Sequence, residues 1–500
     1  MKSFEEYLKE SGEFGYVESI VSPLVYISGL PTVRPGEVVI TERGSQGMVQ
    51  VILPQFVEVL MFETRDLRHQ EKVARTKGLV VIETSDEILG RIIDPFGLPL
   101  DGLGPIGGRK VILPIDREAP GVLKRVRVTE PLETGVSIVD LLVQIGKGQK
   151  ELVAGDQKTG KTTFLLQAAI RQAQAGIICV YVFIGKKKFD LKSIEEHLKK
   201  SGALKSTVIV AATSSDPVAS VYFAPFSGFT IAEYFRDLGR DVLIILDDMT
   251  THAKYYREIA LVGKKTPGRG SYPGDVFHLQ ARILERTGHV KIADGKTASI
   301  TALPVAETQE GDLTGYIQTN LMAMTDGHIF FDVEEQKRGR LPPINHTLSV
   351  TRVGNQTQSS LEKDLRNIIV GRLNNYYRLR ETLSFGSGVS TPIEYVKDVD
   401  LGEKIEALFN QDGTVVVPKA LQHILFGLLF ADFWKDKNLN QLEEEKEKII
   451  KLFFDGGLKK IEDEVLKVNN LASLVTLLTR YLPQISQLFA NGHLQQKTTG

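Results

Sequence analysis

The chain has 500 residues, of which 42% are hydrophobic and 25% are charged, as in ordinary globular proteins of two to four domains. Its 61 Lys and Arg residues balance 62 Asp and Glu residues, which argues against a nucleic-acid-binding protein with the usual basic excess. The single Cys179 excludes a disulfide framework within the chain and fits a reducing compartment. The best membrane-helix candidate, Ile424–Phe430, is far too short, so we expect a membrane role only through partners.

The first predicted region covers residues 1–82. Short β-branched runs alternate there with Gly and Pro, at Val38–Ile40, Val49–Ile52, Val57–Leu60 and Leu79–Ile82. Strands that are this short and this evenly spaced favour a small antiparallel barrel or sandwich. We therefore predict an N-terminal β-barrel.

The second and third predicted regions are residues 83–359 and 360–500. In the second, apolar strand candidates alternate with helical patterns, at Leu152–Ala154, Ile177–Ile184, Val208–Ala212, Val242–Leu246 and Ala298–Leu303. Continuous apolar runs of this kind are typical of a parallel sheet that is covered on both faces. The third region has helical periods, and its charged stretch Glu443–Lys451 predicts a solvated helix face. The predicted fold class is an α/β core with an N-terminal β-barrel and a C-terminal helical domain.

The strongest local motif is a phosphate-binding loop that matches Gly, four residues and Gly-Lys-Thr. It consists of Gly155, Asp156, Gln157, Lys158, Thr159, Gly160, Lys161 and Thr162. The two glycines let backbone N–H groups turn inward toward phosphate oxygens, and the following helix adds favourable partial charge. Lys161 is expected to bind the outer phosphates of ATP or ADP, and Thr162 to ligate Mg²⁺. An apolar strand before the loop and a helical pattern after it argue against a chance glycine-rich turn.

A second motif is the apolar strand Val242–Leu246 followed by Asp247 and Asp248. In phosphate-loop ATPases an acid at such a strand end holds magnesium, directly or through water. Asp247 is the better candidate for the metal. For Asp248 a helix cap or a structural hydrogen bond is an equally good interpretation.

One catalytic element is missing. A ring-forming ATPase needs a residue that orients the attacking water, usually an acid at the end of the strand beside the phosphate loop. Here Ile177–Ile184 is followed by Gly185 and then by Lys186, which cannot act as a base while it is protonated. Asp190 is nearby, and a displaced role for it stays an alternative. We therefore interpret the site as one that binds nucleotide without hydrolysing it.

With these residues in hand, the chain resembles the alpha subunits of F-type ATP synthases over roughly residues 15–430. The loop residues 155–162 look like the alpha version of the motif. The resemblance is also carried by Pro267–Arg269, Tyr272–Phe277, Ser299–Pro304, Glu307–Gln309 and Ser349–Gly354. It implies a β-barrel, a recombinase-like nucleotide domain and a helical domain. It also implies that residues 267–277 line the bearing of a rotating shaft.

The resemblance implies the partners and the catalytic roles as well. Alpha-type chains alternate with catalytic beta-type subunits in a ring around a central shaft of gamma type, and a delta-type peripheral stalk docks on the ring. Arg352 would be the arginine finger that reaches the neighbouring catalytic site, and Ser349 stands where the family needs a Ser for activity. The implied location is the cytoplasmic face of the cell membrane, held there by partner subunits.

Several positions depart from the family pattern. Gln157-Lys158 replaces Arg-Gln before the loop threonine, and Leu341 replaces an arginine beside Pro342 at the adenine pocket. The glutamines expected near Glu394 and Tyr395 are not evident, so weak selection of adenine is predicted.

Three alternatives stay open. An autonomous hexameric ATPase of the secretion type would need its own catalytic acid, which Lys186 disfavours. A ring-shaped RNA translocase would usually need a basic groove. An alpha-like subunit of a machine other than a synthase is compatible with the altered pocket.

Overall fold

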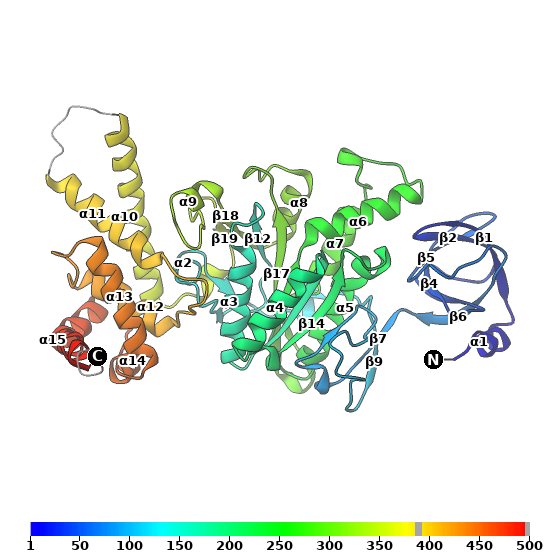
Figure 1. Cartoon of the computed structure of the whole chain (residues 1–500), viewed down its shortest axis with the longest axis horizontal. Helices are drawn as coiled ribbons and strands as arrows, with labels where there is room; N and C mark the ends of the chain where they lie inside the picture. Colours follow the sequence, from blue (N-terminus) through cyan, green and yellow to red (C-terminus); the bar gives the residue numbers. More distant parts are fainter. Residues whose placement is uncertain (1, 386–392, 496–500) are drawn as a thin grey trace. The chain divides into compact units, whose positions relative to one another are not determined.

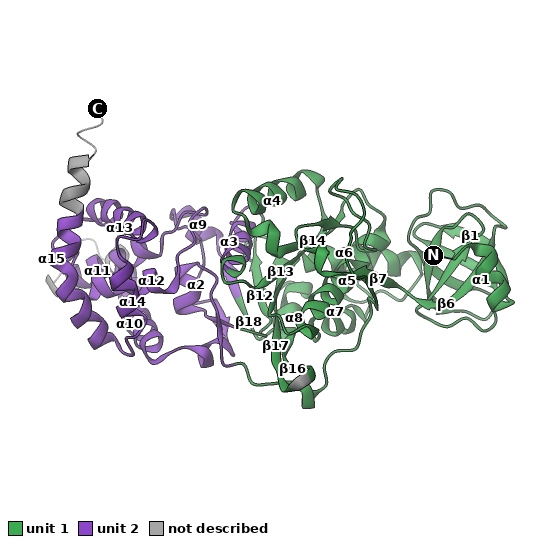
Figure 2. Ribbon diagram, turned by 90° about the horizontal axis from the view of Figure 1, so that it is seen from below, with its two compact units in different colours: residues 1–128, 147–157, 172–328 green, residues 129–146, 158–171, 329–500 purple. Residues whose placement is uncertain are grey.

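The computed structural model describes residues 2–385 and 393–495. By its internal contacts the chain divides into two compact units, each assembled from separate stretches of sequence (Figure 2). Unit 1 comprises residues 1–128, 147–157 and 172–328, and unit 2 comprises residues 129–146, 158–171 and 329–500. The predicted boundaries after residues 82 and 359 stay predictions.

Unit 1 begins with a short helix and a closed barrel of six strands (Figure 1). The helix is α1 (Phe4–Ser11), capped by Ser3 and Glu6 in a reciprocal capping box. The strands are β1 (Phe14–Val21), β2 (Leu24–Gly29), β3 (Glu37–Thr41), β4 (Gln46–Ile52), β5 (Val57–Met61) and β6 (Lys72–Leu79), in the order β1-β2-β5-β4-β3-β6. All their pairings are antiparallel, and valines dominate the buried interior. The predicted barrel is confirmed.

One predicted strand is wrong in detail. The run Leu79–Ile82 is divided, because β6 ends at Leu79 and β7 (Val81–Thr84) begins after Val80. β7 leaves the barrel and pairs with β9 (Val111–Pro114) in a separate two-stranded sheet. Hydrophobicity alone does not mark this break, because Leu79, Val80 and Val81 are all apolar, although only Val80 is buried.

The core sheet of unit 1 is mainly parallel. Its strands follow the order β12 (Glu151–Gly155), β17 (Thr297–Glu307), β15 (Val242–Asp247), β13 (Ile178–Lys186), β14 (Thr207–Thr213) and β8 (Ile92–Ile93). Only β16 (Gly288–Lys291) runs antiparallel to its neighbour, β17. Every residue of β14 and β15 is buried, so both faces of the sheet are covered, as the apolar runs predicted.

Helices flank this sheet (Figure 1). They are α4 (Lys188–Lys200), α5 (Val218–Asp237), α6 (Met249–Val262), α7 (Val276–Leu284) and α8 (Tyr316–Met324). The longest, α5, packs along β13, β14, β15 and β17 and is buried over nearly its whole length. Cys179 in β13 is fully buried and unpaired, and burial raises the pKa of its thiol to about 12.

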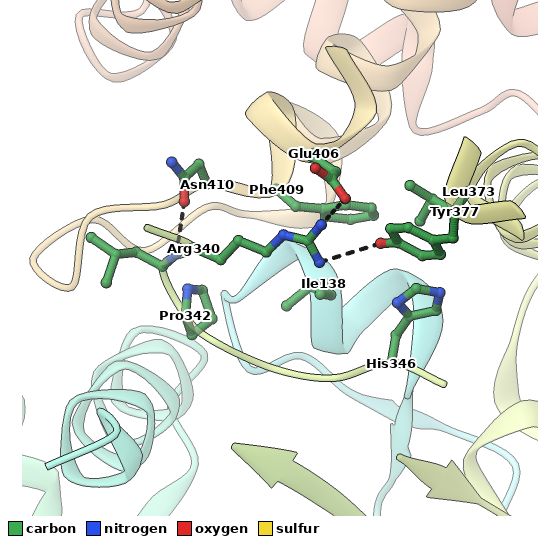
Figure 3. Close-up of a pocket in the computed structure, with 10 residues that line it drawn as sticks. Ile138, Arg340, Pro342, His346, Leu373, Tyr377, Glu406, Phe409 and Asn410 are labelled. Carbon is green, nitrogen blue, oxygen red and sulfur yellow. Dashed lines mark hydrogen bonds and ion pairs between the residues drawn. The ribbon is translucent and has the colours of Figure 1, made fainter. Parts of the chain in front are cut away.

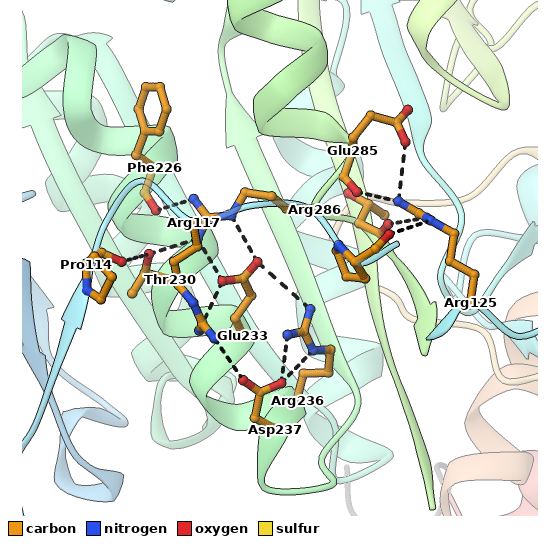
Figure 4. A network of polar contacts seen from close by, with 12 residues as sticks. Pro114, Arg117, Arg125, Phe226, Thr230, Glu233, Arg236, Asp237, Glu285 and Arg286 are labelled. Atoms are coloured by element: carbon orange, nitrogen blue, oxygen red, sulfur yellow. Dashed lines mark hydrogen bonds and ion pairs between the residues drawn. The ribbon is translucent and has the colours of Figure 1, made fainter. Parts of the chain in front are cut away.

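A buried ion-pair network joins α5 to the segment after α7 (Figure 4). Arg286 donates Nε to Oε1 of Glu233 at 3.0 Å and Nη2 to Oε2 at 2.9 Å, which is a two-point contact. The Arg286 and Glu233 side chains are only 1% and 2% exposed. Arg286 also donates to the carbonyl oxygens of Ile115 and Phe226, and Arg117 lies 3.2 Å from Glu233. Both arginines therefore lie against the carboxylate of Glu233.

Unit 2 is mainly helical. Its elements are β10 (Pro131–Leu132), α2 (Ser137–Leu142), β11 (Ile145–Gly146), α3 (Lys161–Gln174, which ends in unit 1), β18 (Gly327–Phe331, which begins in unit 1), α9 (Val333–Lys337), β19 (Val350–Thr351), α10 (Ser360–Phe385), α11 (Ile393–Phe409), α12 (Lys419–Phe430), α13 (Leu439–Phe454), α14 (Lys459–Val465) and α15 (Leu471–Gln495). α12 is the core helix, since Ala420–Leu429 are all buried and it packs against α11, α13, α14 and α15.

The charged stretch Glu443–Lys451 lies in α13, as predicted, but it is not wholly solvated. Lys446 donates to the carbonyl oxygens of Ala407 and Asn410, and burial lowers the pKa of its ammonium to about 8. The predicted fold class is confirmed, with an N-terminal barrel, a mainly parallel α/β core and a helical C-terminal region. Among the described residues, no helix is both long and apolar enough to span a membrane.

Candidate functional site

The first part of the phosphate-binding loop is fixed to the end of β17 in unit 1. Gly155 closes β12 and pairs with Glu307, and its carbonyl accepts from the backbone N–H of Thr308 at 3.0 Å. The carboxylate of Asp156 accepts from the Thr308 hydroxyl and from the backbone N–H of Gly311 at 3.0 Å. Gln157 donates its amide to Glu307 at 3.0 Å. These contacts hold the loop at the carboxyl edge of the sheet.

The second part of the loop lies in unit 2 and leads into α3. Lys158 has a left-handed backbone, with φ of 64°, and its carbonyl accepts from Gln336 at 3.0 Å. Gly160 has φ of 95°, which disfavours any side chain there. Thr159 and Lys161 are buried and Thr162 is half-buried. Because α3 begins at Lys161, the N–H groups of its first turn have the orientation that favours phosphate.

Asp247 ends β15 and is 1% exposed. Its Oδ2 accepts from the hydroxyl of Tyr181 at 2.8 Å, and its Oδ1 forms an ion pair with Nζ of Lys186. Burial works against the Lys186 charge, but Asp247 and Asp248 outweigh it, so the pKa of Lys186 is raised. Lys186 is therefore a protonated cation at the position where a catalytic acid was sought.

Asp248 is the N-cap of α6. Its carboxylate accepts from the backbone N–H of Thr251 at 2.5 Å and from the Thr251 hydroxyl at 3.1 Å. Burial raises the pKa of Asp248 to about 6. Of the two interpretations left open by the sequence, the geometry favours the helix cap. Asp190 lies in the first turn of α4 and is exposed.

The two predicted magnesium ligands are Thr162 and Asp247. They lie in different units, and each is considered by itself. Asp247 has both carboxylate oxygens engaged, so direct coordination would require Lys186 to leave it. Within residues 2–385 and 393–495, no group of three or more His, Cys, Asp or Glu side chains is arranged to hold a metal.

Arg352 sits on a firmly held segment of unit 2. It lies between β19 and the short 3₁₀ helix η6 (Gly354–Thr357), as the sequence predicted. The hydroxyl of Thr351 donates to the carbonyl of Gln144 at 2.8 Å and accepts from the N–H of Gly354 at 3.2 Å. A Cβ on Gly354 would lie 1.5 Å from the Gln144 oxygen, so only glycine fits. The backbone is therefore anchored on both sides of Arg352.

The Arg352 side chain itself is exposed. Across the described part of the chain its guanidinium makes no hydrogen bond or ion pair. Ser349 is different, because its hydroxyl donates to the carbonyl of Asn345 at 2.7 Å and accepts from the N–H of Phe330 at 3.0 Å. Ser349 thus ties the segment before Arg352 to β18.

Most polar side chains that line the predicted base pocket are already engaged, with Nε2 of His346 the exception (Figure 3). The backbone N–H of Leu341, whose side chain is 54% exposed, donates to Oδ1 of Asn410 at 2.7 Å. The neighbouring Arg340 forms ion pairs with Glu335 and Glu406 and donates to the Tyr377 hydroxyl at 3.3 Å. The arginine next to Leu341 therefore points into the helical unit.

The absence of base-reading glutamines near Glu394 and Tyr395 stays a prediction. The side chains of Glu394 and Tyr395 lie outside the described residues. The side chains near Leu341 are instead Asn410 and Gln411, after α11. Gln411 accepts from the backbone N–H of Ser137 at 3.1 Å and donates to the Gly135 carbonyl at 2.7 Å.

Comparisons with known proteins agree with this geometry. Residues 135–351 match the model of the ATP synthase alpha/beta family, nucleotide-binding domain. The chain is 38% identical over 457 residues to ATP synthase subunit alpha of Mycoplasmoides gallisepticum, covering 91% of this chain and 88% of that protein. It is 38% identical to the subunit alpha of Neorickettsia sennetsu (85% and 84% covered) and 36% identical to that of Azobacteroides pseudotrichonymphae (93% and 94% covered).

Proposed function

The chain belongs to the family of ATP synthase alpha subunits, and from that premise we propose that it is the nucleotide-binding, non-catalytic subunit of a rotary F1 ring. In that ring it would support synthesis of ATP from ADP and phosphate, coupled to ion transport by partner subunits. The observation that carries the proposal is an exposed, unengaged Arg352 on an anchored backbone.

Nucleotide binding is assigned to the phosphate loop, residues 155–162. Lys161 would meet the outer phosphates of ATP or ADP, and the N–H groups of the loop and of the first turn of α3 would hold the others. Mg²⁺ is assigned to two candidate ligands, each considered by itself: the Thr162 hydroxyl, and Asp247, whose carboxylate is held by Lys186. Bound magnesium would neutralise phosphate charge.

Lack of catalysis is assigned to Lys186. A protonated ammonium in an ion pair with Asp247 cannot accept a proton from water. Asp190 is exposed on α4 and has no contact with this pair in the described structure. The chain would therefore bind nucleotide at its own loop and take part in hydrolysis only at a partner's site.

The contribution to that partner is assigned to Arg352. A planar, permanently charged guanidinium suits charge that develops on a phosphoryl group, and its fork can meet two oxygens. A finger must be free in the subunit that supplies it and must also be well placed. The anchors at Thr351 and Gly354 supply the placement. Ser349 is a positioning residue in this account, because its hydroxyl is used within the fold.

The remaining assignments rest on family membership. We propose beta-type catalytic subunits alternating with this chain, a gamma-type shaft against residues 267–277 and a delta-type peripheral stalk. The assembly would lie at the cytoplasmic face of the cell membrane, which it would reach through partners. We also propose folding units of residues 1–82, 83–359 and 360–500, which limited proteolysis can test.

Calorimetry with ATP and ADP tests the nucleotide site directly. Lys161→Ala should abolish measurable binding, whereas Lys187→Ala, at an exposed neighbouring turn, should bind like the wild type. Equal binding by Lys161→Ala and wild type would remove the assignment. The purified chain should also turn over ATP far below about 1 per second, the lower end of ordinary enzyme rates.

Two alternatives have distinct outcomes. A loop-dependent ATPase in the purified homo-oligomer would favour an autonomous secretion-type motor. Native purification that recovers beta-type partners without synthase membrane subunits would favour an alpha-like subunit of another machine.

A further inference from the structure

We propose that the Lys186 ammonium supplies at Asp247 the positive charge that magnesium supplies in other phosphate-loop ATPases, so that this chain binds nucleotide with little dependence on Mg²⁺. The inference rests on the proposed nucleotide site at residues 155–162. It concerns what stabilises that site, and not which residues contact the phosphates.

The ion pair lies on the same sheet edge as the start of the phosphate loop. Parallel registers pair Gly155 with Glu307, Leu246 with Pro304 and Phe183 with Asp247. The carboxyl ends of β12, β17, β15 and β13 therefore follow one another along this edge. Glu307 connects them further, because it accepts from Gln157 of the loop at 3.0 Å. Lys186 thus engages the strand-end acid that helps to hold the metal in this class of protein.

The acids on this edge are already engaged by groups of the chain. Asp247 is held by Lys186 and by the Tyr181 hydroxyl. Asp248 caps α6 through Thr251, and Glu307 accepts from Gln157. A divalent cation at Asp247 would compete with Lys186 for the same carboxylate.

Electrostatics make the displacement of Lys186 unfavourable. Asp247 is almost fully buried, and a buried carboxylate needs a compensating charge. Lys186 provides that charge from a side chain that is 21% exposed. If magnesium entered, the ammonium would lose its partner and would face a like charge at short range. The Lys186 ammonium is part of the chain, so it supplies this charge without the binding and ordering of a free Mg²⁺ ion.

The first test compares nucleotide affinity in excess Mg²⁺ with affinity in excess EDTA, by calorimetry with ATP and with ADP. The wild-type affinities should differ by less than about threefold, which is roughly 0.6 kcal/mol. In Lys186→Gln, which removes the charge, the affinity in EDTA should fall at least about tenfold below that in Mg²⁺, or 1.4 kcal/mol. Lys187→Gln makes the same change of charge at an exposed neighbour and should behave like the wild type.

The second test uses Mg²⁺ alone as the ligand in thermal unfolding. Mg²⁺ should leave the Tm of the wild type unchanged and should raise that of Lys186→Gln, in which Asp247 is vacated. A wild type that binds nucleotide through Lys161 yet loses tenfold affinity in EDTA overturns the inference, and this arm needs no variant at position 186. Nucleotide binding that is unaffected by Lys161→Ala would instead refute the proposed site, which makes the two failures distinguishable.

Discussion

Arg286 and Arg352 lie in two regions of the molecule that give an arginine side chain opposite environments, one buried and one exposed. Arg286 is 1% exposed and is held by both oxygens of Glu233 and by backbone carbonyls (Figure 4). Arg352 is exposed and unengaged within the described residues, while the backbone on both sides of it is anchored. Around Arg286 the contacts fix the side chain, whereas around Arg352 they fix only the backbone that carries it.

The difference separates stability from function. A buried, fully paired guanidinium leaves no donor for a ligand, and removing it would leave a buried carboxylate without its two-point contact. A free guanidinium on a rigid backbone contributes little to folding, but its donors are available to another molecule. The following predictions test that separation, beginning with the largest expected effect.

Arg352→Ala should lower ATP hydrolysis by the reconstituted ring by about 10³–10⁵-fold, the usual effect of removing an arginine finger. Folding and this chain's own nucleotide binding should stay unchanged, because the side chain has no partner in the described part of the chain. The measurement is a coupled hydrolysis assay with a beta-type partner. Arg352→Lys keeps the charge without the fork and should recover activity only in part. An alanine variant with more than about half the wild-type rate would contradict the finger assignment.

Arg286→Met should lower the free energy of unfolding by about 3–5 kcal/mol, because Glu233 stays buried and loses its two-point contact, keeping Arg117 at 3.2 Å and Arg236 at 3.9 Å. The change is measured by unfolding in urea, monitored by far-UV circular dichroism. The double variant Arg286→Met with Glu233→Leu should recover much of the loss, since the buried carboxylate that lost its two-point contact is then absent. Arg65→Ala, which breaks an exposed pair with Glu63, is the control and should unfold like the wild type. A single variant as stable as that control would show that the network is unimportant.

Gly354→Ala should lower hydrolysis by the ring by about 10²-fold, the scale expected when a catalytic group is misplaced by about 1 Å. The added methyl would collide with the Gln144 carbonyl and shift the backbone next to Arg352. Gly371→Ala in α10, where nothing lies within 4 Å of an added Cβ, is the matched control. Equal rates for the two variants would mean that the anchor does not position Arg352.

His423 is a third case, because it is buried without being engaged. Neither ring nitrogen has a hydrogen-bond partner among the described residues, and burial lowers its pKa to about 4. The unfolded chain, with an ordinary pKa near 6.5, therefore binds the proton first as the pH falls. Stability should decrease between about pH 6.5 and 4, by on the order of 1–2 kcal/mol at pH 5 from this residue. His423→Leu should flatten that part of the curve, and unchanged curves would contradict the assignment.

The smallest effect is expected in the ratio of the affinities for ATP and GTP. The polar groups beside Leu341 resemble Arg286 in being engaged already, since Arg340 is paired with acids and Gln411 with backbone groups. ATP should therefore be preferred over GTP by less than about 100-fold, or 2.7 kcal/mol. Competition between the two nucleotides in calorimetry measures the ratio. A larger preference would show that a residue other than these hydrogen-bonds to the adenine base.

Local patterns were enough to predict much of this molecule. The strands of the core, the turn that follows Thr351 and the loop before α3 are set by short-range periodicity and by glycine. The division of Leu79–Ile82 between two sheets was missed because both parts are apolar and only their pairing differs.

Contacts between distant segments escaped the sequence analysis. Lys186 was recognised as a missing acid, but its ion pair with Asp247 depends on neighbouring strands β13 and β15, whose ends are far apart in sequence. The meeting of Leu341 with Asn410 likewise depends on how a loop packs against the end of α11. Composition and spacing carry no information about such pairings.

The burial of Cys179 has a practical consequence for measuring motion. A thiol that is fully buried, with its pKa raised to about 12, is nearly unreactive toward maleimides at neutral pH. Because it is the only cysteine of the chain, the natural sequence already serves as a background without reactive thiols. One cysteine introduced at an exposed position would then carry a fluorophore or a surface tether at a single known place, so that motion could be followed molecule by molecule.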